Sequence, residues 1–329
     1  MSIKVTGTGI YVPELIVTND DLAKIVDTSD EWISKRTGIK RRRISNGELA
    51  YQMGAKAAKM ALEEAKLTID EIDMILATTM SPDCFTPSVA SLVGYELGNN
   101  TAAAMDINGA CTGFVYAFDI ARNFLETKAY RNILIVSTEF ITRDIDFEDR
   151  STCVLFGDGA SAAVVTLGEG IYASYLGGDS TGAYRLYSKV LHHKSPWDKK
   201  RDSYGIEEVD LFPHGYMFME GNEIYKFATV MLPKAVEMVL NKANLTKDEL
   251  DLLVPHQANE RILISANKKL KLPVEKVYVG LTDYGNISSA CIPLGLYHLK
   301  QEGRLKAGDK VCLVGFGAGL TYGAVVFEW

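Results

Sequence analysis

One cysteine stands in a setting that favours a reactive sulfur. Cys111 lies in the segment 108–114 (NGACTGF), between an apolar run at 102–107 and apolar residues that recur at helical spacing from Phe114 to Ala121. This places Cys111 at the start of a helix, where exposed backbone N–H groups and the helix dipole favour a thiolate. A thioester carbonyl is a natural target for such a sulfur. Taken alone, however, a cysteine beside glycines is more often a small core residue.

Two polar side chains follow predicted turns or strands elsewhere in the chain. His256 comes directly after the apolar strand 252–255, and in parallel α/β sheets sites lie at the carboxyl ends of strands. Asn286 lies in the segment 283–290 (DYGNISSA), where a turn-forming Gly-Asn leads into small residues that enter a helix. Asn286 can therefore point a fixed amide into a cavity. The plainer alternatives are a histidine satisfied within a loop and an asparagine that caps a helix.

A glycine-rich turn supplies backbone donors. The segment 315–323 (GFGAGLTYG) follows the predicted strand 311–314, and its glycines allow backbone N–H groups to approach a ligand closely. The alternative is a tight turn between core strands. The remaining cysteines show no CxxC spacing, and the odd total of five argues against both a disulfide framework and a metal site.

An internal repeat organises the elements that must position these residues. When the chain is shifted against itself by 178 positions, two separate pairs of segments match without a gap. The pairs are 67–75 (LTIDEIDMI) with 245–253 (LTKDELDLL), and 133–136 (ILIV) with 311–314 (VCLV). The repeat predicts two halves of one fold, with a boundary near residue 170, so that the first half spans 1–170 and the second 171–329.

Periodicity within the first half indicates alternating helices and strands. Continuous apolar runs at 74–77, 133–137 and 162–167 are typical of central strands that helices cover on both faces. A helical stripe is predicted at Met53, Ala57, Met60 and Ala61. The fold class is therefore α/β, with mostly parallel sheets.

Composition excludes several classes of protein. Hydrophobic residues make up 47% of the 329 residues and charged residues 23%, as in an ordinary globular protein. The net charge of -7 argues against general nucleic-acid binding. No apolar run reaches the roughly 20 residues of a membrane span, and residues 1–13 lack the features of a signal peptide. We expect a cytoplasmic protein with no membrane partner.

Taken together, Cys111, His256, Asn286 and the glycine turn resemble the beta-ketoacyl-acyl-carrier-protein synthase III family of condensing enzymes. The resemblance covers almost the whole chain. Further motifs that carry it are 30–39 (DEWISKRTGI), 157–160 (GDGA), 256–259 (HQAN) and 284–286 (YGN). It implies a thiolase-like fold, in which two duplicated halves with mostly parallel or mixed sheets are sandwiched by helices in five layers, α-β-α-β-α.

The resemblance also implies a mechanism. Cys111 would attack an acyl-CoA primer, and backbone N–H groups of Cys111 and Ala318 would form the oxyanion hole. Malonyl-acyl carrier protein would then lose carbon dioxide while neutral His256 and Asn286 donate hydrogen bonds to its thioester oxygen. The product, a 3-oxoacyl-acyl carrier protein, would initiate fatty acid synthesis. Acyl-CoA is a substrate in this scheme, and neither a cofactor nor a metal is expected.

The substrate contacts follow from the same resemblance. Trp32, Arg36 and Arg150 correspond to CoA-binding positions, where an indole lies against adenine and guanidinium groups reach phosphate. The plainer reading of Trp32 is a half-buried helix anchor. Thr86 corresponds to a position that lines the acyl pocket, and its small side chain leaves room for primers longer than acetyl.

Partners are also implied. Arg261, Lys268 and Lys269 lie on a predicted helix after His256 and would attract an acidic carrier protein to the tunnel mouth. A solvated helix face is the plainer reading of these charges. Relatives pair through the first half of the chain, so a homodimer is expected.

Two departures from the family pattern bear on substrate choice. Ile287 follows Asn286 where threonine is common, and the stretch 185–219 is longer than a compact member needs. That stretch contains His192, His193, Trp197 and His214 and could form a lid or a dimer contact. Two other functions stay open: a specialised member that makes a secondary metabolite or acylates a heteroatom, and a catalytically silent scaffold paralogue.

Overall fold

Two β-sheets form the framework of the molecule. The computed structural model describes residues 1–98, 101–188, 201–202, 205–206 and 215–329. The first sheet has the strand order β1-β7-β6-β4-β5, and the second has the order β13-β14-β15-β8. The bounds of the first are β1 Ser2–Tyr11, β7 Gly159–Gly168, β6 Asn132–Glu139, β4 Met74–Thr78 and β5 Ala103–Ile107. Those of the second are β13 Leu252–Pro255, β14 Lys310–Gly317, β15 Thr321–Glu328 and β8 Tyr172–Gly178.

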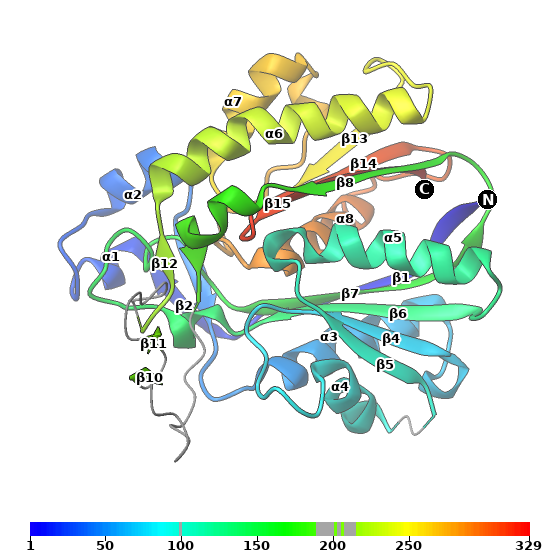
Figure 1. The fold of residues 1–329 in the computed structure, drawn as a ribbon, viewed down its shortest axis with the longest axis horizontal. Helices are drawn as coiled ribbons and strands as arrows, with labels where there is room; N and C mark the ends of the chain where they lie inside the picture. Colours follow the sequence, from blue (N-terminus) through cyan, green and yellow to red (C-terminus); the bar gives the residue numbers. More distant parts are fainter. Residues whose placement is uncertain (99–100, 189–200, 203–204, 207–214) are drawn as a thin grey trace.

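Helices form the other three layers (Figure 1). The middle layer, α5 and α8, lies between the two sheets, while α3 and α4 cover the outer face of the first sheet and α6 and α7 that of the second. Their bounds are α3 Ala50–Ala65, α4 Val89–Leu97, α5 Gly113–Glu126, α6 Gly221–Lys242, α7 Glu260–Leu270 and α8 Cys291–Gln301. The predicted five-layer thiolase-like fold is therefore confirmed.

Smaller elements lie around this framework. At the amino-terminal side they are β2 Leu15–Thr18, α1 Asn19–Leu22, α2 Asp30–Thr37 and β3 Arg41–Ile44. Four two-residue strands follow β8: β9 Leu186–Tyr187, β10 Arg201–Asp202, β11 Gly205–Ile206 and β12 Phe218–Met219. The 3-10 turns η2 Ala110–Thr112 and η6 Ser288–Ala290 matter most, because they introduce α5 and α8. His192, His193, Trp197 and His214 lie outside the described residues.

The internal repeat is visible in individual hydrogen bonds. Glu71 accepts from the backbone N–H and hydroxyl of Thr68, and Glu249 accepts in the same way from Thr246, 178 positions later. The carboxylate of Asp73 likewise accepts from the backbone N–H of the first residue of β6, as that of Asp251 does from the first residue of β14. The repeated sequence T-x-D-E-x-D thus closes the same local structure in both halves.

Strand direction is mixed rather than mostly parallel. The pairs β4–β5, β4–β6 and β13–β14 are parallel, whereas β7 and β15 run antiparallel to both of their neighbours. One reason is local, since β14 and β15 are joined by only three residues, and so short a connection permits only an antiparallel pair. The chain passes from the first sheet to the second between Gly168 and Tyr172, and the boundary predicted near residue 170 lies in this connection.

The core forms between the layers. Met53, Ala57 and Ala61 of α3 are fully buried against the first sheet, but Met60 is 36% exposed, so the predicted stripe is correct at three positions and wrong at the fourth. Phe114 and Phe118 of α5 are buried between the two sheets with Phe327 of β15. Among the described residues, no helix is both long and apolar enough to cross a membrane.

Candidate active site

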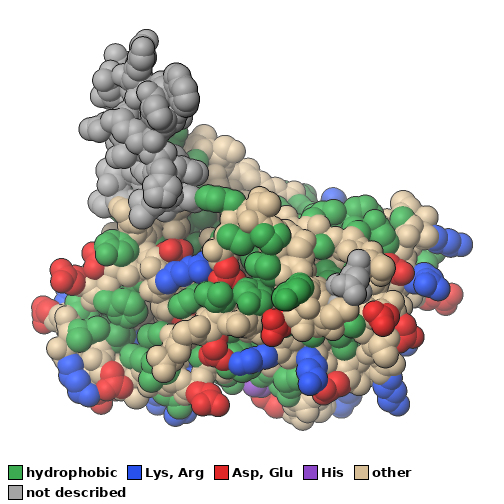
Figure 2. All heavy atoms as spheres, turned by 90° about the horizontal axis from the view of Figure 1, so that it is seen from below, with side chains coloured by type: hydrophobic (Ala, Val, Ile, Leu, Met, Phe, Trp, Pro, Cys, Tyr) green, Lys and Arg blue, Asp and Glu red, His purple; other side chains and the backbone are tan. Residues whose placement is uncertain are grey.

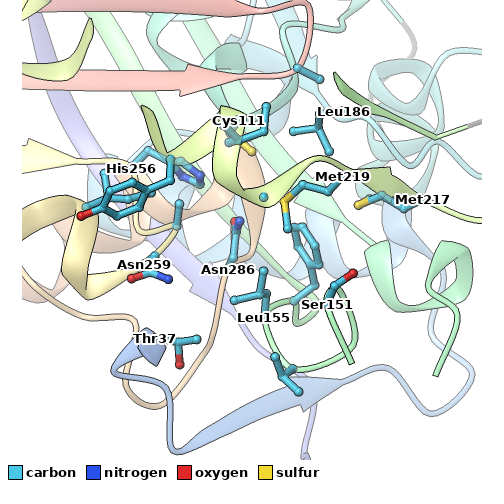
Figure 3. A pocket seen from close by; sticks show the side chains of 18 of the residues that line it. Thr37, Cys111, Ser151, Leu155, Leu186, Met217, Met219, His256, Asn259 and Asn286 are labelled. Carbon is cyan, nitrogen blue, oxygen red and sulfur yellow. The ribbon is translucent and has the colours of Figure 1, made fainter. Parts of the chain in front are cut away.

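Three side chains from distant segments meet in one cavity. Cys111, His256 and Asn286 all line a cavity of about 320 Å³ at the ends of the two sheets, and Figure 3 shows their side chains pointing toward one another. They are 5%, 1% and 6% exposed, so the meeting point is deep in the molecule. Each stands just past the carboxyl end of a strand or in the turn before a helix, where the sequence predicts a site.

The cysteine is held by a tight turn. Cys111 is the middle residue of η2, directly before α5, and Ala110 before it adopts a left-handed backbone with φ of 46°. This conformation is unfavourable for a residue other than glycine. The glycine turn packs directly against it, since a Cβ atom on Gly317 would stand 2.8 Å from the backbone nitrogen of Cys111. Glycine is therefore required at position 317 to let the two turns approach.

The sulfur is a protonated thiol in the resting protein, which corrects the expectation of a thiolate. Burial raises the pKa of Cys111 to about 12. The hydroxyl of Ser288 and the backbone N–H at Cys111 lower the pKa, while the charge of Glu139 raises it further. Desolvation in the deep cavity therefore raises the pKa of the thiol more than the position at the start of a helix lowers it. The proton must leave as the sulfur attacks.

Asn286 is fixed at both its backbone and its side chain. Its backbone N–H donates to the carbonyl of Leu155 at 2.8 Å, and its own carbonyl accepts from Gly157 at 3.1 Å. Its side-chain oxygen accepts from the backbone N–H of Ser288 at 2.8 Å. Only the amide oxygen can accept from an N–H group, so the amide nitrogen is the free end. Asn286 thus presents a donor to the cavity.

His256 is neutral and packed edge-on to an aromatic ring. Its backbone N–H donates to the carbonyl of Val314 at 2.8 Å, and its ring centroid lies 5.4 Å from that of Phe316. Burial lowers the pKa of His256 to about 3, against a smaller opposing effect from the backbone of Ser288. Neutral imidazole carries one N–H donor and one acceptor, so His256 can either donate a hydrogen bond or take a proton.

The glycine turn completes the cavity on the side of the cysteine. Ala318 lines the cavity between β14 and β15, and its carbonyl accepts from the hydroxyl of Thr321 at 3.0 Å. The same hydroxyl contacts the hydroxyl of Thr112 at 3.0 Å and the carbonyl of Gly109 at 3.3 Å. Thr321 therefore ties the turn that carries Ala318 to the turn that carries Cys111.

Comparison with known proteins identifies the family. The carboxyl-terminal model of 3-oxoacyl-[acyl-carrier-protein] synthase III matches residues 240–329, and a second model of the same synthase matches residues 105–180. The beta-ketoacyl-[acyl-carrier-protein] synthase III of Clostridium acetobutylicum is 44% identical over 100% of this chain and 99% of its own length. This chain belongs to the beta-ketoacyl-acyl-carrier-protein synthase III family. The predicted family and the predicted class of enzyme, a condensing acyltransferase, are confirmed.

Solved structures of synthase III agree in fold. The enzyme from Aquifex aeolicus is 41% identical with a TM-score of 0.90, covering 99% of this chain and 100% of its own. The priming beta-ketosynthase of the R1128 polyketide pathway is 36% identical with a TM-score of 0.87, covering 99% of this chain and 96% of its own. The synthase III architecture therefore also occurs in a specialised pathway.

The cavity of this synthase III member opens beside a stacked tryptophan. Arg36 and Arg150 each lie over the ring of Trp32, with guanidinium carbons 4.4 Å and 4.9 Å from its centroid. All three residues line the cavity that holds Cys111. The three residues predicted to bind CoA therefore lie together, and two exposed cations beside a flat indole suit a nucleotide with phosphates.

Thr86 and Ile287 do not line the cavity that holds Cys111. Thr86 is exposed on the loop before α4 and is not one of the cavity-lining residues, so within one chain it does not border the acyl site. Ile287 is 1% exposed and packs with Cys291 and Leu294, away from the cavity. Its side chain therefore fills the core and does not contact a substrate in the cavity.

The predicted docking residues share one surface. Arg261, Lys268 and Lys269 are all exposed on α7, which begins immediately after the cavity-lining Asn259. Asn259 caps this helix by accepting from the backbone N–H of Arg261 at 2.9 Å. The basic helix therefore starts at the cavity and runs away from it across the surface.

Several residues at the cavity cannot be predicted from the sequence pattern alone. Met217, Met219 and Leu186 form an apolar wall near Cys111, as labelled in Figure 3. In the sequence Ser288 is only one of several small residues after Asn286, yet it affects the pKa of both Cys111 and His256. Methionines in a long segment give no local signal of a pocket, whereas the left-handed turn at Ser288 repeats that at Ala110 and could have been inferred from the internal repeat.

Proposed function

We propose that this chain catalyses the decarboxylating Claisen condensation of an acyl-CoA primer with malonyl-acyl carrier protein. The product is a 3-oxoacyl-acyl carrier protein, which initiates fatty acid synthesis. The observation that carries the proposal is the convergence of one thiol and two neutral hydrogen-bonding side chains, Cys111, His256 and Asn286, in one buried cavity.

In the first step Cys111 takes the acyl group from CoA. The sulfur attacks the thioester carbonyl while neutral His256 accepts the thiol proton, because free thiolate is scarce when the pKa is about 12. Backbone N–H groups of Cys111 and Ala318 stabilise the oxyanion, each worth roughly 3 kcal/mol in comparable sites. The carbon–sulfur bond to CoA breaks, CoA leaves as a thiol with the proton from His256, and acyl-Cys111 remains.

In the second step the malonyl thioester becomes a carbon nucleophile. The bond to its carboxylate breaks, carbon dioxide leaves, and the electron pair moves into an enolate whose oxygen accepts hydrogen bonds from His256 and Asn286. A neutral histidine suits this role, since no proton has to be removed from carbon. The enolate carbon attacks the acyl carbonyl and expels the sulfur of Cys111, which takes up one proton from water and returns to the thiol. With this proton the step balances without a cofactor or a metal.

Two protein partners belong to the proposal. The first is the carrier protein, which we place against α7, where Arg261, Lys268 and Lys269 offer positive charge to an acidic surface. The second is another copy of this chain. β5 is an edge strand of the first sheet, and Met105 on it and Tyr95 on α4 are 38% and 78% exposed. Figure 2 shows hydrophobic side chains across the middle of the face that carries α3 and α4.

The cellular setting stays a prediction. We place the reaction in the cytoplasm, and neither nucleic acid nor membrane has a part in it. The likeness to a priming ketosynthase of a polyketide pathway favours one second candidate, in which the same condensation starts a secondary metabolite. The identity of the product distinguishes fatty acid synthesis from the start of a secondary metabolite better than the chain length of the accepted primer does.

The proposal is tested by product analysis. The purified chain is incubated with a graded set of acyl-CoAs and malonyl-acyl carrier protein, and the carrier protein is examined by mass spectrometry. We expect a 3-oxoacyl group on the carrier protein and release of one carbon dioxide per product, with none from Cys111→Ala. Acyl transfer to an added alcohol or amine without carbon dioxide release would support heteroatom acylation instead. No turnover with any primer would favour a silent scaffold.

A further inference from the structure

The internal repeat gives the second half of the chain a turn, η6, that is equivalent to the turn η2 that carries Cys111. η2 and η6 lie 178 positions apart, and Ala110 and Ser288 in them share a left-handed backbone, with φ of 46° and 48°. Asn108 accepts from the backbone of Ala110, just as Asn286 accepts from that of Ser288. Ser289 is therefore the counterpart of Cys111 in the other half.

The remaining counterparts are polar and buried. At the same offset Thr78 corresponds to His256, and Glu139 at the end of β6 corresponds to Gly317 of the glycine turn. Thr78 and Ser289 hydrogen-bond to each other at 3.0 Å, and neither lines the catalytic cavity. The second turn has thus kept the geometry of the first but has a hydrogen-bond network in place of an open site.

Glu139 is the centre of this network. Its side chain is fully buried, and one carboxyl oxygen accepts from the hydroxyl of Ser289 at 2.8 Å and from its backbone N–H at 3.4 Å. The other oxygen accepts from the hydroxyl of Ser81 at 2.9 Å, the backbone N–H of Met80 at 3.1 Å and the hydroxyl of Thr79 at 3.2 Å. Among the described residues, two backbone N–H groups and three hydroxyl groups thus hold the carboxyl group, while burial raises its pKa.

The turn held by Glu139 contacts both reacting residues. The buried hydroxyl of Ser288 makes no hydrogen bond of standard geometry among the described residues. The Ser288–Ser289 turn packs against the start of α5, since a Cβ atom at Gly113 would stand 3.4 Å from the Cβ atom of Ser289. The hydroxyl of Ser288 lowers the pKa of the Cys111 thiol and the pKa of the Glu139 carboxyl group, and the backbone of Ser288 raises the pKa of His256. This hydroxyl therefore acts on both the carboxyl group of Glu139 and the sulfur of Cys111, and it can donate to the thiolate as it forms.

We infer that Glu139 is a positioning residue, whose buried carboxyl group holds the Ser288–Ser289 turn so that the hydroxyl of Ser288 stabilises the sulfur of Cys111 as it loses its proton. The inference deepens the proposed function, because it concerns the activation of the same cysteine. Glu139 itself does not line the cavity, so it acts through the turn and touches no substrate.

Two simpler roles make different predictions. If Glu139 acted only through its charge, replacing it with a neutral residue would lower the pKa of Cys111, since the charge raises that pKa. If Glu139 only stabilised the fold, its replacement would leave the reactivity of the folded protein unchanged. If it positions Ser288, its replacement removes a stabilising donor, and the thiol becomes less reactive.

Alkylation of Cys111 by iodoacetamide separates these cases. The rate is measured at pH 8.5 by mass spectrometry of the peptide that contains Cys111, in a Cys84→Ser background, because Cys84 is exposed. For Glu139→Gln, whose amide group cannot accept from all five donors, we expect a rate lower by roughly tenfold, the effect of about one lost hydrogen bond. The same fall is expected for Ser288→Ala.

The double variant tests whether the two residues act as one unit. Glu139→Gln with Ser288→Ala should be no slower than either single variant, within about twofold. The matched control is Asp158→Asn, because Asp158 is equally buried and accepts from the backbone N–H groups of Ser45 and Thr142, while its hydrogen bonds among the described residues include none to the Ser288–Ser289 turn. The Asp158→Asn variant should have a lower free energy of unfolding but an unchanged rate of alkylation at Cys111.

The outcomes decide the inference in either direction. A faster or unchanged rate in Glu139→Gln, or effects of the two substitutions that multiply, would overturn it. If Glu139→Gln does not fold, Ser289→Ala replaces it, with an expected fall of about threefold that again does not multiply with Ser288→Ala. The assay uses neither acyl-CoA nor malonyl-acyl carrier protein, so its failure is distinguishable from a failure of the proposed condensation.

Discussion

The backbone N–H of Ser288 donates to the side-chain oxygen of Asn286 at 2.8 Å, and this one bond decides which end of the amide faces the cavity. The free end is the NH₂ group, a donor, beside the neutral imidazole of His256. Two neutral donors suit an oxygen on which negative charge develops, as in an enolate. A hydrolase that pairs cysteine with imidazolium would instead need a carboxylate to orient the histidine.

Replacing Asn286 should separate the two chemical steps. Asn286→Asp keeps an oxygen for the N–H of Ser288 but puts a second, negatively charged oxygen where the enolate forms. We expect condensation to fall by roughly 100-fold or more, while acyl transfer to Cys111 stays within about threefold. Product formation and the acyl-enzyme are both measured by mass spectrometry. The control is Asn259→Asp, which lines the same cavity and can still cap α7. Equal losses in both steps would contradict the assignment.

Gly317 should tolerate no side chain. A Cβ atom there would stand 2.8 Å from the backbone nitrogen of Cys111, so Gly317→Ala must push the glycine turn away from the cysteine. We expect the acylation rate to fall by roughly 100-fold and the free energy of unfolding by about 1–3 kcal/mol. Gly215→Ala is the control, because a Cβ atom at Gly215 meets no atom of the described residues within 4 Å. Near-normal acylation in Gly317→Ala would show that Cys111 and the turn do not form one oxyanion site.

Trp32 should matter only for substrates with a nucleotide. Its ring lies against Arg36 and Arg150 at the cavity mouth, far along the chain from Cys111. For Trp32→Ala we expect KM for acyl-CoA to rise about tenfold with kcat within threefold, because ground-state and transition-state binding are lost equally. Acylation by a short thioester that lacks the nucleotide should not change. A loss with both substrates would make Trp32 a structural anchor instead.

The buried histidine should make the protein sensitive to acid. Its pKa is about 3 in the folded chain and 6.5 when exposed, so between these values the unfolded chain binds a proton that the folded chain does not. Stability from this group is complete above pH 6.5 and is lost as the pH falls. Between pH 7.5 and 5.5 the wild type should lose about 1.4 kcal/mol more than His256→Gln in urea unfolding. Equal losses would place a solvated histidine at this position.

Much of this site could be predicted from the sequence because its parts are local. Cys111, His256 and Asn286 each follow a strand end or a turn and are flanked by small residues, and the fold brings such ends together. The match at an offset of 178 positions predicts two halves. It can be recognised because the segment T-x-D-E-x-D forms the same local hydrogen bonds at both places where it occurs. Signals of this kind need no knowledge of the rest of the chain.

Other features depend on the surroundings and could not be predicted in this way. The helix start at Cys111 suggested a thiolate, but the pKa of the thiol is set by burial beneath elements from both halves. Met60 fits a helical stripe and yet is exposed, because periodicity gives the direction of a face but not its width. Thr86 lies outside the cavity of its own chain, and no local pattern could reveal that.

Intact-protein mass spectrometry tests the central claim most directly. The chain is mixed with a pool of acyl-CoAs and weighed before and after addition of malonyl-acyl carrier protein. The account predicts an adduct with the mass of one acyl group on the wild type, no stable thioester adduct on Cys111→Ala, and loss of the adduct once malonyl-acyl carrier protein is added. An adduct of equal amount on Cys111→Ala, or one that malonyl-acyl carrier protein does not discharge, would contradict it.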